Sequence, residues 1–326
     1  MSVELVEVVR SGFRECVHRG SLVVLDPTGE PLFALGEVQT PIYPRSANKP
    51  WQAVTMLRHG FAPESPEELV LATASHEGES DHVELVLQLL ARHGLSESDL
   101  RCPPALPANE LAHAELLAAG ELPRPVYMNC SGKHAAMLAT CVVNGWPTNG
   151  YLEPTHPMQL AVTETFGDLV GEEELEYGID GCGLPIVPLS LTRLAASFAR
   201  LVLAAPETPE RAVADAVREH PYLVSGTGKD DLLLMSTVPG LFTKSGAEGV
   251  LVGALPDGTS FAFKVEDGSE RARLPLAAAL VHRLGVEWAT ERHGAESTTE
   301  LAALASRPVL GGGARVGTVR AVPGLF

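Results

Sequence analysis

The order of secondary-structure signals along this chain of 326 residues limits its fold more than any other feature. Two short apolar runs, 22–25 and 32–35, flank the turn sequence Asp26-Pro27-Thr28-Gly29 and predict a β-hairpin near the N-terminus. Helical patterns fill the middle of the chain, and strand-like runs return late, at 240–244, 250–254 and 261–265. This order predicts a mixed α/β fold, in which both chain ends build one central sheet and a helical lobe is inserted between them.

The helical patterns predict where the lobes begin and end. The spacing of apolar residues predicts helices at 50–60, 81–93, 110–119, 133–144, 157–166, 191–204 and 209–219, and a late helix at 274–284. We expect a single domain of two closely packed lobes, because no Pro/Gly/Ser-rich linker interrupts the chain: a sheet lobe of about 1–60 plus 235–326 and a largely helical lobe of 61–234. The tail 291–326 carries no recognisable motif beyond a short helical pattern at 301–304.

Charge and apolar content argue against several classes of partner. The chain has 24 basic and 41 acidic residues and a formal net charge of −17, which disfavours binding to nucleic acid or to an anionic membrane. The N-terminal residues lack the pattern of a secretory signal, and the longest apolar stretch, 194–205, is broken by Arg200. We therefore expect a cytoplasmic protein. Its five cysteines, an odd number, favour free or metal-bound thiols over disulfides.

Ser46-Ala47-Asn48-Lys49 forms an S-x-x-K motif where a turn enters a predicted helix. Side chains three residues apart lie on one face of a helical turn, so a lysine with a lowered pKa can take the proton of the serine hydroxyl. In isolation the motif favours a simpler interpretation, a helix-capping serine followed by a surface lysine.

Two further segments extend this motif. Lys244-Ser245-Gly246 lies at the end of a predicted strand, and S-x-x-K followed at long range by K-[ST]-G on a strand is typical of penicillin-recognising serine enzymes. Ser75, in the segment 73–78, is our candidate for the second serine of such a site, where it would relay a proton. The alternatives are an ordinary strand-end turn for the first segment and a helix cap for Ser75.

Two glycine-bearing loops carry a cysteine each, Cys130 and Cys182. If the loops meet, the two thiolates can bind a soft cation such as zinc. The third ligand is then either Lys133 or His134, and chemistry alone favours the histidine. The alternative is a pair of buried, apolar cysteines.

Taken together, these segments resemble the Rhizobium etli-type, or class 3, L-asparaginases, the asparaginase II family. They occur in family order over about residues 5–285 and comprise the sequences Arg45-Ser46-Ala47-Asn48-Lys49-Pro50, Ala74-Ser75-His76, Asn129-Cys130-Ser131-Gly132-Lys133-His134, Asp180-Gly181-Cys182-Gly183 and Lys244-Ser245-Gly246-Ala247-Glu248-Gly249. The resemblance implies a fold similar to serine β-lactamases and serine-dependent glutaminases, a homodimer, and hydrolysis of L-asparagine to L-aspartate and ammonia.

The resemblance also implies two serine–lysine pairs. Ser46, the expected nucleophile, pairs with Lys49, and Ser75 pairs with Lys244. Lys264 competes with Lys244 for the role of second lysine, but it lacks the K-[ST]-G context.

The remaining implied roles concern zinc and substrate. The family's zinc ligands correspond to Cys130, Lys133 and Cys182, so the resemblance selects the lysine, which must be deprotonated to bind. The expected substrate-binding residues are Arg45 for the α-carboxylate, Asp180 for the α-ammonium group, and His134.

Three other functions use the same residues. A serine-dependent glutaminase would differ only in substrate choice, and one methylene is worth roughly 1–3 kcal/mol of discrimination. A penicillin-recognising acyl hydrolase would need an extracytoplasmic substrate, which the expected cytoplasmic location disfavours. A non-catalytic zinc- or amino-acid-binding protein would not need both serine–lysine pairs, and all four residues are present.

Overall fold

The computed structural model describes residues 1–170, 177–292 and 294–326, and these residues form two compact units. We call the first the sheet unit; it consists of Met1–Ala47, Leu189–Arg200 and Leu233–Phe326. We call the second the helical unit; it consists of Asn48–Pro188 and Leu201–Leu232. The predicted lobes differ from these units in two places, because residues 48–60 belong to the helical unit and residues 189–200 to the sheet unit. The close packing of the lobes stays a prediction.

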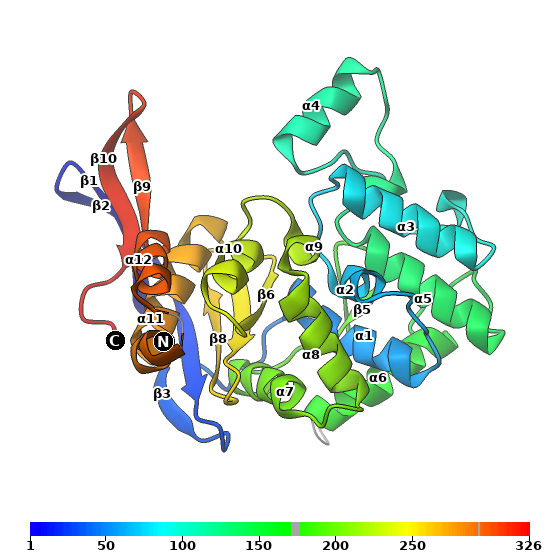
Figure 1. Cartoon of the computed structure of the whole chain (residues 1–326), viewed down its shortest axis with the longest axis horizontal. Helices are drawn as coiled ribbons and strands as arrows, with labels where there is room; N and C mark the ends of the chain where they lie inside the picture. Colours follow the sequence, from blue (N-terminus) through cyan, green and yellow to red (C-terminus); the bar gives the residue numbers. More distant parts are fainter. Residues whose placement is uncertain (171–176, 293) are drawn as a thin grey trace. The chain divides into compact units, whose positions relative to one another are not determined.

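The sheet unit contains an eight-stranded sheet whose paired strands are all antiparallel. The strands are β1 (Val3–Arg10), β2 (Phe13–Leu25), β3 (Pro31–Leu35), β6 (Phe242–Gly246), β7 (Val250–Ala254), β8 (Ser260–Val265), β9 (Ser306–Gly311) and β10 (Ala314–Ala321). Their order is β6-β7-β8-β2-β1-β10-β9, and β3 pairs with β2. N-terminal strands therefore lie between strands from the last third of the chain (Figure 1). The predicted mixed α/β fold, with a sheet from both chain ends, is confirmed.

The predicted N-terminal hairpin is formed by β2 and β3. The Asp26 carboxylate accepts hydrogen bonds from the backbone N–H groups of Thr28 (2.8 Å) and Glu30 (3.0 Å), and Gly29 has a φ of +90°. These contacts are those that an Asx-type turn requires. The C-terminal tail was not predicted to join the sheet, yet it supplies β9 and β10, and β10 pairs with β1.

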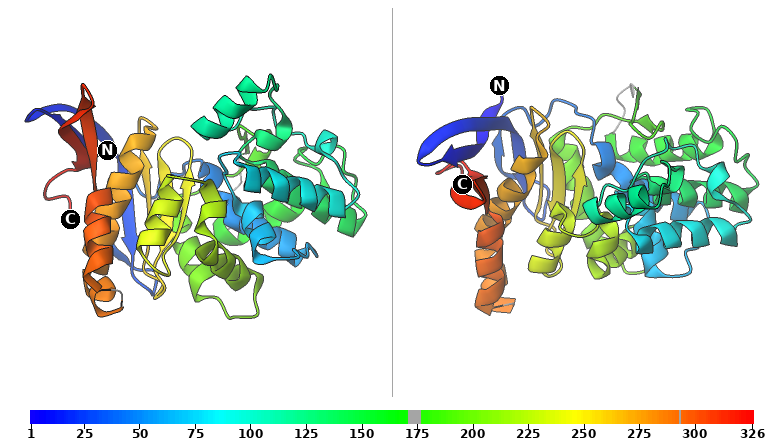
Figure 2. Two further views of the ribbon diagram at one scale, coloured as in Figure 1. Left: turned by 45° about the horizontal axis from the view of Figure 1, so that its top comes forward. Right: turned by 90° about the horizontal axis from the view of Figure 1, so that it is seen from above.

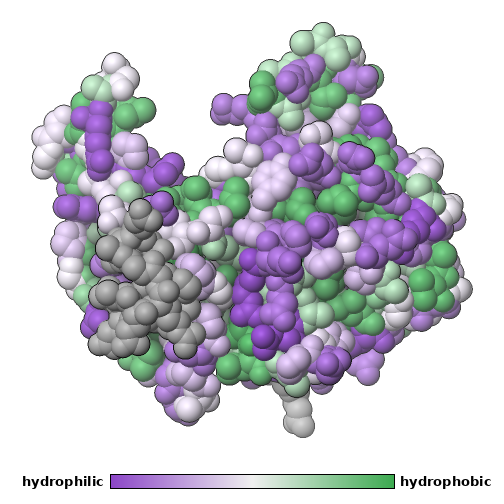
Figure 3. Space-filling model, viewed as in Figure 1, coloured by the Kyte–Doolittle hydropathy of each residue, from purple (hydrophilic) through white to green (hydrophobic). Residues whose placement is uncertain are grey.

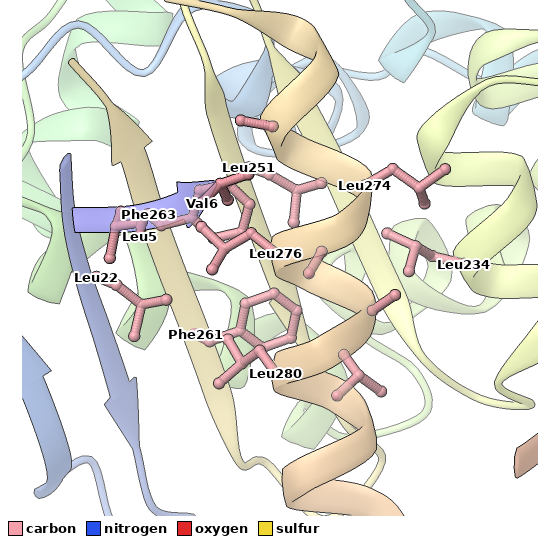
Figure 4. Close-up of a cluster of buried hydrophobic side chains, with 14 of the residues drawn as sticks. Leu5, Val6, Leu22, Leu234, Leu251, Phe261, Phe263, Leu274, Leu276 and Leu280 are labelled. Atoms are coloured by element: carbon pink, nitrogen blue, oxygen red, sulfur yellow. The ribbon is translucent and has the colours of Figure 1, made fainter. Parts of the chain in front are cut away.

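The core of the sheet unit lies between the sheet and α11 (Arg273–Arg292). Phe261 and Phe263 on β8 point toward Leu276 and Leu280 on the helix, and all four side chains are fully buried (Figure 4). Figure 2 shows α11 running along the sheet, with α12 (Gly294–Leu304) following it. Burial of each such side chain contributes about 1.5–3 kcal/mol, so this layer holds the strands in place.

The helical unit is built from α1 (Lys49–Arg58), α2 (Pro66–Thr73), α3 (Ser80–Arg92), α4 (Glu110–Ala118), α5 (Ser131–Asn144), α6 (Pro157–Val170), α8 (Pro209–Glu219) and α9 (Pro221–Ser225), with a short hairpin of β4 (Gly178–Ile179) and β5 (Pro185–Ile186). Two more helices, α7 (Leu191–Leu203) and α10 (Asp230–Thr237), have residues in both units. The central helix is α5, in which every residue from Ser131 to Cys141 is buried. A Cβ atom on Gly132 would lie 2.6 Å from the Leu71 carbonyl oxygen, so α5 and α2 touch through their backbones.

Hydrophilic residues are widespread on the face drawn in Figure 3, as expected for a net charge of −17. An exception is α4, which has no buried residue and exposes Leu111 (68%) and Leu117 (54%). Within the described ranges, none of the helices has both the length and the apolar content that crossing a membrane would take.

Candidate active site

Ser46 lies in a short 3-10 helix, Arg45–Asn48, that leads directly into α1. The preceding Arg45 has a φ of +53°, a left-handed conformation that strains a residue with a Cβ by about 1–3 kcal/mol. Strain of this kind is typical of functional turns. The N-cap of α1 is Asn48, and Lys49 is fully buried. The alternative of a capping serine followed by a surface lysine is therefore wrong.

The turn that carries Ser46 packs against the end of β6. A Cβ atom on Gly246 would lie 2.5 Å from the carbonyl oxygen of Pro44 and 3.4 Å from the backbone nitrogen of Ala47, so only glycine fits. Lys244 and Gly246 are two residues apart and therefore share one face of the strand. The structure thus places Lys244, which is fully buried, on the face of β6 that meets the Ser46 turn.

Lys264, the rival of Lys244, lies on β8. It pairs with Val250, which in turn pairs with Gly246, so Lys264 lies two strands from β6. Its ammonium group donates a hydrogen bond to the carbonyl oxygen of Val265. Burial lowers the pKa of Lys264, but the side chain is only partly buried.

Lys49 is the first residue of α1, and its ammonium group lies inside the helical unit. It donates hydrogen bonds to the carbonyl oxygen of Ala74 and to Ser75 Oγ, the latter at 2.9 Å. Burial lowers the pKa of Lys49, and the positive charge of Lys133 acts in the same direction, whereas the neighbouring Cys130 opposes it. A buried lysine of this kind is suited to act as a base.

Ser75 lies just beyond the C-terminus of α2. The chain leaves that helix in an extended conformation at Ala74 (φ −70°, ψ 148°), and the Ser75 N–H donates to the carbonyl oxygen of Val224 (2.8 Å). The next helix, α3, has Glu79 as its N-cap, so Ser75 does not cap it. The helix-cap alternative for Ser75 is wrong, and the serine instead contacts Lys49.

The two cysteine loops meet in the helical unit. Cys130 immediately precedes α5, and Cys182 lies in the turn between β4 and β5. Lys133 Nζ is 3.3 Å from Cys182 Sγ, and the Asp180 carboxylate is 3.9 Å from the same sulfur. All three candidate zinc ligands, Cys130, Lys133 and Cys182, are buried.

The charges of this cluster are interdependent. A hydrogen bond from Cys182 and the positive charges of two lysines hold the pKa of the Cys130 thiol well below its usual value. The same hydrogen bond, together with burial, raises the pKa of Cys182. Burial alone would lower the pKa of Lys133, but the two sulfurs raise it. These shifts favour a charge pair between the Cys130 sulfur and the Lys133 amine when no metal is bound.

The donor set fits a zinc ion. A tetrahedral zinc places sulfur and nitrogen ligands roughly 3.5 Å from each other, close to the 3.3 Å between Lys133 Nζ and Cys182 Sγ. Zinc binds thiolates and neutral amines, so binding would release protons from these side chains. Over the part of the chain that the structure describes, no group of three histidine, cysteine, aspartate or glutamate side chains could hold a metal. A site here therefore depends on the lysine.

The expected substrate-binding residues occupy both units. In the helical unit, His134 is fully buried; its Nδ1 is 2.7 Å from the Tyr151 hydroxyl, and its Nε2 has no hydrogen-bond partner among the described residues. Asp180 accepts a hydrogen bond from the Gly181 N–H (2.9 Å). Arg45 belongs to the sheet unit, where its guanidinium lies 3.8 Å from the Glu248 carboxylate.

The structure thus brings most of the candidate residues together within their own units. The helical unit assembles Lys49, Ser75, Cys130, Lys133 and Cys182. The sheet unit holds Arg45, Ser46 and Lys244. Two buried residues, His76 and Tyr151, have no role that the sequence indicates, because only the tertiary structure shows their hydrogen bonds.

Comparison with known proteins identifies the family. Among solved structures, a β-lactamase from Mycobacterium bovis is similar over 82% of this chain and 94% of its own, with 15% identity and a TM-score of 0.45. A Bacillus glutaminase is similar over 82% and 90%, with 14% identity and a TM-score of 0.34. None of the curated protein sequences matches the chain. The family model described as L-asparaginase II matches residues 6–321. Because this match covers nearly the whole sequence, the chain belongs to the L-asparaginase II family, amidohydrolases that act on L-asparagine.

Proposed function

We propose that this amidohydrolase releases L-aspartate and ammonia through an ester on Ser46, with Lys49 as the base that activates the serine. The observation that carries the proposal is the environment of Lys49: a fully buried amine, three residues after Ser46, that donates to Ser75 and to the carbonyl oxygen of Ala74. A lysine held in this way loses its proton more easily than one in water.

The hydrogen bonds of Lys49 support its role as a base. A neutral amine has two N–H bonds and one lone pair. The Ala74 carbonyl can only accept, and Ser75 Oγ also accepts from Lys49, so these two contacts use both N–H bonds. The lone pair then remains for the proton of Ser46. The Cys130 sulfur also interacts with the Lys49 amine and can occupy this third position in place of Ser46. If Cys130 bound a metal, its sulfur would no longer be available for that contact.

The first half of the reaction forms the ester. Lys49 takes the hydroxyl proton of Ser46 while Ser46 Oγ attacks the side-chain amide carbon of asparagine. The backbone N–H of Ser46 is a candidate donor to the oxyanion. The proton then reaches the amide nitrogen through Ser75, which is hydrogen-bonded to Lys49, and the C–N bond breaks to release ammonia.

The second half of the reaction hydrolyses the ester. A water molecule loses a proton to the same base, attacks the ester carbon and frees aspartate, and Ser46 regains its proton. Lys244 is the second lysine in this proposal, because it is fully buried and lies on the face of β6 that packs against the Ser46 turn. Its positive charge would stabilise the deprotonated serine during both steps.

Recognition of the amino acid requires opposite charges for its two ionised groups. Arg45 would bind the α-carboxylate and Asp180 the α-ammonium group. His134 would contribute its Nε2, which has no partner among the described residues, to a polar group of the substrate. These residue types match the α-carboxylate and α-ammonium groups that asparagine and glutamine share.

Zinc is part of the proposal. Cys130, Lys133 and Cys182 would hold it, since their spacing and donor types fit. A bound zinc ion would supply a fixed positive charge that supports substrate affinity more than chemistry. We also propose a homodimer and a cytoplasmic location; both rest on the family resemblance and on the sequence.

Ammonia release from L-asparagine and from L-glutamine, each with and without zinc, tests this function. We expect fast release from asparagine and little from glutamine, with a lower KM when zinc is present. Release from glutamine alone would make the protein a glutaminase with the same serine–lysine chemistry. Covalent labelling by a radioactive penicillin, with no ammonia from either amino acid, would instead indicate a penicillin-recognising acyl hydrolase.

A further inference from the structure

His76 follows the candidate relay Ser75 directly and is fully buried. Its backbone N–H donates to the carbonyl oxygen of Asn129 (3.1 Å), and its ring Nε2 lies 2.8 Å from Ser131 Oγ. Asn129 and Ser131 flank Cys130 at the start of α5. His76 is therefore attached twice, by backbone and by side chain, to the segment that carries one of the candidate zinc ligands.

The hydrogen bonds of His76 fix its tautomer. Ser131 Oγ donates its only hydrogen to the carbonyl oxygen of Val126 (2.8 Å), so toward His76 it can only accept. Nε2 must then carry a hydrogen. The other ring nitrogen, Nδ1, accepts from the Gly78 N–H (3.1 Å) and cannot carry one. The geometry permits only the neutral Nε2–H imidazole, with both ring nitrogens satisfied.

The surroundings leave this ring little freedom. The ring of His82 stacks on that of His76 with centroids 5.2 Å apart and an interplanar angle of 13°. The backbones of α2 and α5 touch at Gly132, so the two elements that His76 joins cannot slide past each other. A side chain this constrained is suited to set the position of its neighbour, Ser75.

We propose that His76 is a positioning residue that fixes Ser75 against Lys49 by tying the segment after α2 to the start of α5 through Ser131. The inference rests on the proposed function, because it takes Ser75 to be the proton relay. His76 itself does not touch the reacting atoms in this account. It keeps the Ser75 hydroxyl at the 2.9 Å distance from Lys49 Nζ that a relay requires.

Two substitutions of His76 test the two hydrogen bonds of its ring separately. In His76→Asn, the shorter amide can still accept from the Gly78 N–H but cannot reach Ser131. In His76→Gln, the longer amide can still donate to Ser131. Ser131→Ala removes the acceptor and leaves the histidine unchanged. His18→Asn is the matched control, because His18 is a buried histidine of β2 in the sheet unit, with Asp267 2.7 Å from its Nδ1.

The experiment measures kcat and KM for ammonia release from asparagine, with Tm recorded for every variant. We expect kcat to fall about tenfold or more in His76→Asn and in Ser131→Ala, with KM within about twofold of wild type, because small misplacements of a reacting group slow the chemical step. The double variant, which combines His76→Asn with Ser131→Ala, should be no slower than the slower single variant, since both substitutions break the same hydrogen bond. His76→Gln should recover most of the rate, and His18→Asn should retain it.

Other outcomes would overturn the inference. A merely structural role for His76 would lower Tm in both single variants and leave kcat per folded molecule unchanged. Multiplying losses in the double variant would show that the two residues act separately. If His76→Asn fails to fold, Ser131→Ala alone decides between these outcomes. An inactive wild type would refute the proposed function and this inference with it, whereas an active wild type with unaffected variants would refute only the inference.

Discussion

Lys244 and Lys264 lie on the same sheet and compete for one catalytic role. Lys244 is fully buried and lies on the strand face that packs against the Ser46 turn, whereas Lys264 lies two strands away. We predict that Lys244→Met lowers kcat about 100-fold or more, the range typical of a lost proton-transfer or electrostatic group. Lys264→Met should stay within about twofold of wild type.

Ammonia-release kinetics on both variants check this prediction, with Tm measured alongside. Methionine has a similar length and carries no charge, so folding should survive at either position. The assignment would be reversed if Lys264→Met lost activity while Lys244→Met kept it.

His76 makes the stability of the protein depend on pH. Burial lowers its pKa in the folded protein well below 6.5, so below that pH the unfolded chain binds a proton that the folded one does not. The contribution of His76 to the free energy of unfolding is thus complete above pH 6.5. Below that pH it falls by about 1.4 kcal/mol per pH unit, until the pH reaches the pKa of His76 in the folded protein.

Urea unfolding between about pH 7.5 and 5.5 measures this slope. His76→Gln lacks the titrating group, so its stability should decline less steeply than that of wild type on acidification. If the free energy of unfolding had the same pH dependence in wild type and His76→Gln, His76 would not stay neutral in the folded protein.

At the residue scale, the sequence predicted those candidate site residues that lie in short motifs. Ser46, Lys49 and Ser75 lie in such motifs, and the structure places Lys49 against Ser75. The contacts of His76 and Tyr151 join residues 55 and 17 positions away along the chain. No local pattern reports contacts of this kind, so these residues could not be assigned from the sequence.

At the scale of elements, the approach of β6 to the Ser46 turn depends on Gly246. We predict that Gly246→Ala lowers stability by about 1–3 kcal/mol and also reduces kcat, because the new Cβ would lie 2.5 Å from the Pro44 carbonyl oxygen and force the turn away. Thermal unfolding and ammonia release measure the two effects.

Gly167→Ala is the matched control for this substitution. Gly167 lies in α6, and no described atom beyond its own stretch of helix lies within 4 Å of its would-be Cβ. Alanine is the better helix former by up to about 1 kcal/mol. This control should be slightly more stable and equally active. Wild-type stability and rate in Gly246→Ala would contradict the close approach seen in the structure.

The elements found from the sequence are those with strong local signals. The β2–β3 hairpin has a turn with its own side-chain caps, and α3 has a clear apolar stripe with Val86, Leu89 and Leu90 buried. The missed elements lack such signals. Leu69–Leu71 is too short a run to distinguish helix from strand, and it proved to lie in α2. Strands β9 and β10 depend on pairing with β1, at the other end of the chain.

At the scale of the whole molecule, zinc links binding to stability. A ligand that binds only the folded state stabilises it, by about 2.7 kcal/mol at 100 times its Kd. We predict that zinc raises the Tm of wild type and that Cys130→Ala abolishes this shift. Cys141→Ala should keep it, because Cys141 is a buried cysteine of α5, the helix that Cys130 precedes, and is not among the candidate ligands.

Differential scanning calorimetry with and without zinc measures the Tm of each protein. An equal shift in Cys130→Ala and wild type would place the metal elsewhere. The sequence could suggest two cysteines for this site, but the choice of Lys133 over His134 came from the family resemblance. In the structure, Lys133 contacts Cys182, and Nδ1 of His134 is bonded to Tyr151.

Ser46 is the nucleophile in the proposed mechanism, and turnover of L-asparagine by Ser46→Ala tests this role most directly. Ser46 is only partly buried in its 3-10 turn, so its replacement by alanine should leave the Tm close to that of wild type. We predict that wild type releases ammonia and that Ser46→Ala loses turnover almost completely. Ammonia release by Ser46→Ala at the wild-type rate would contradict this role.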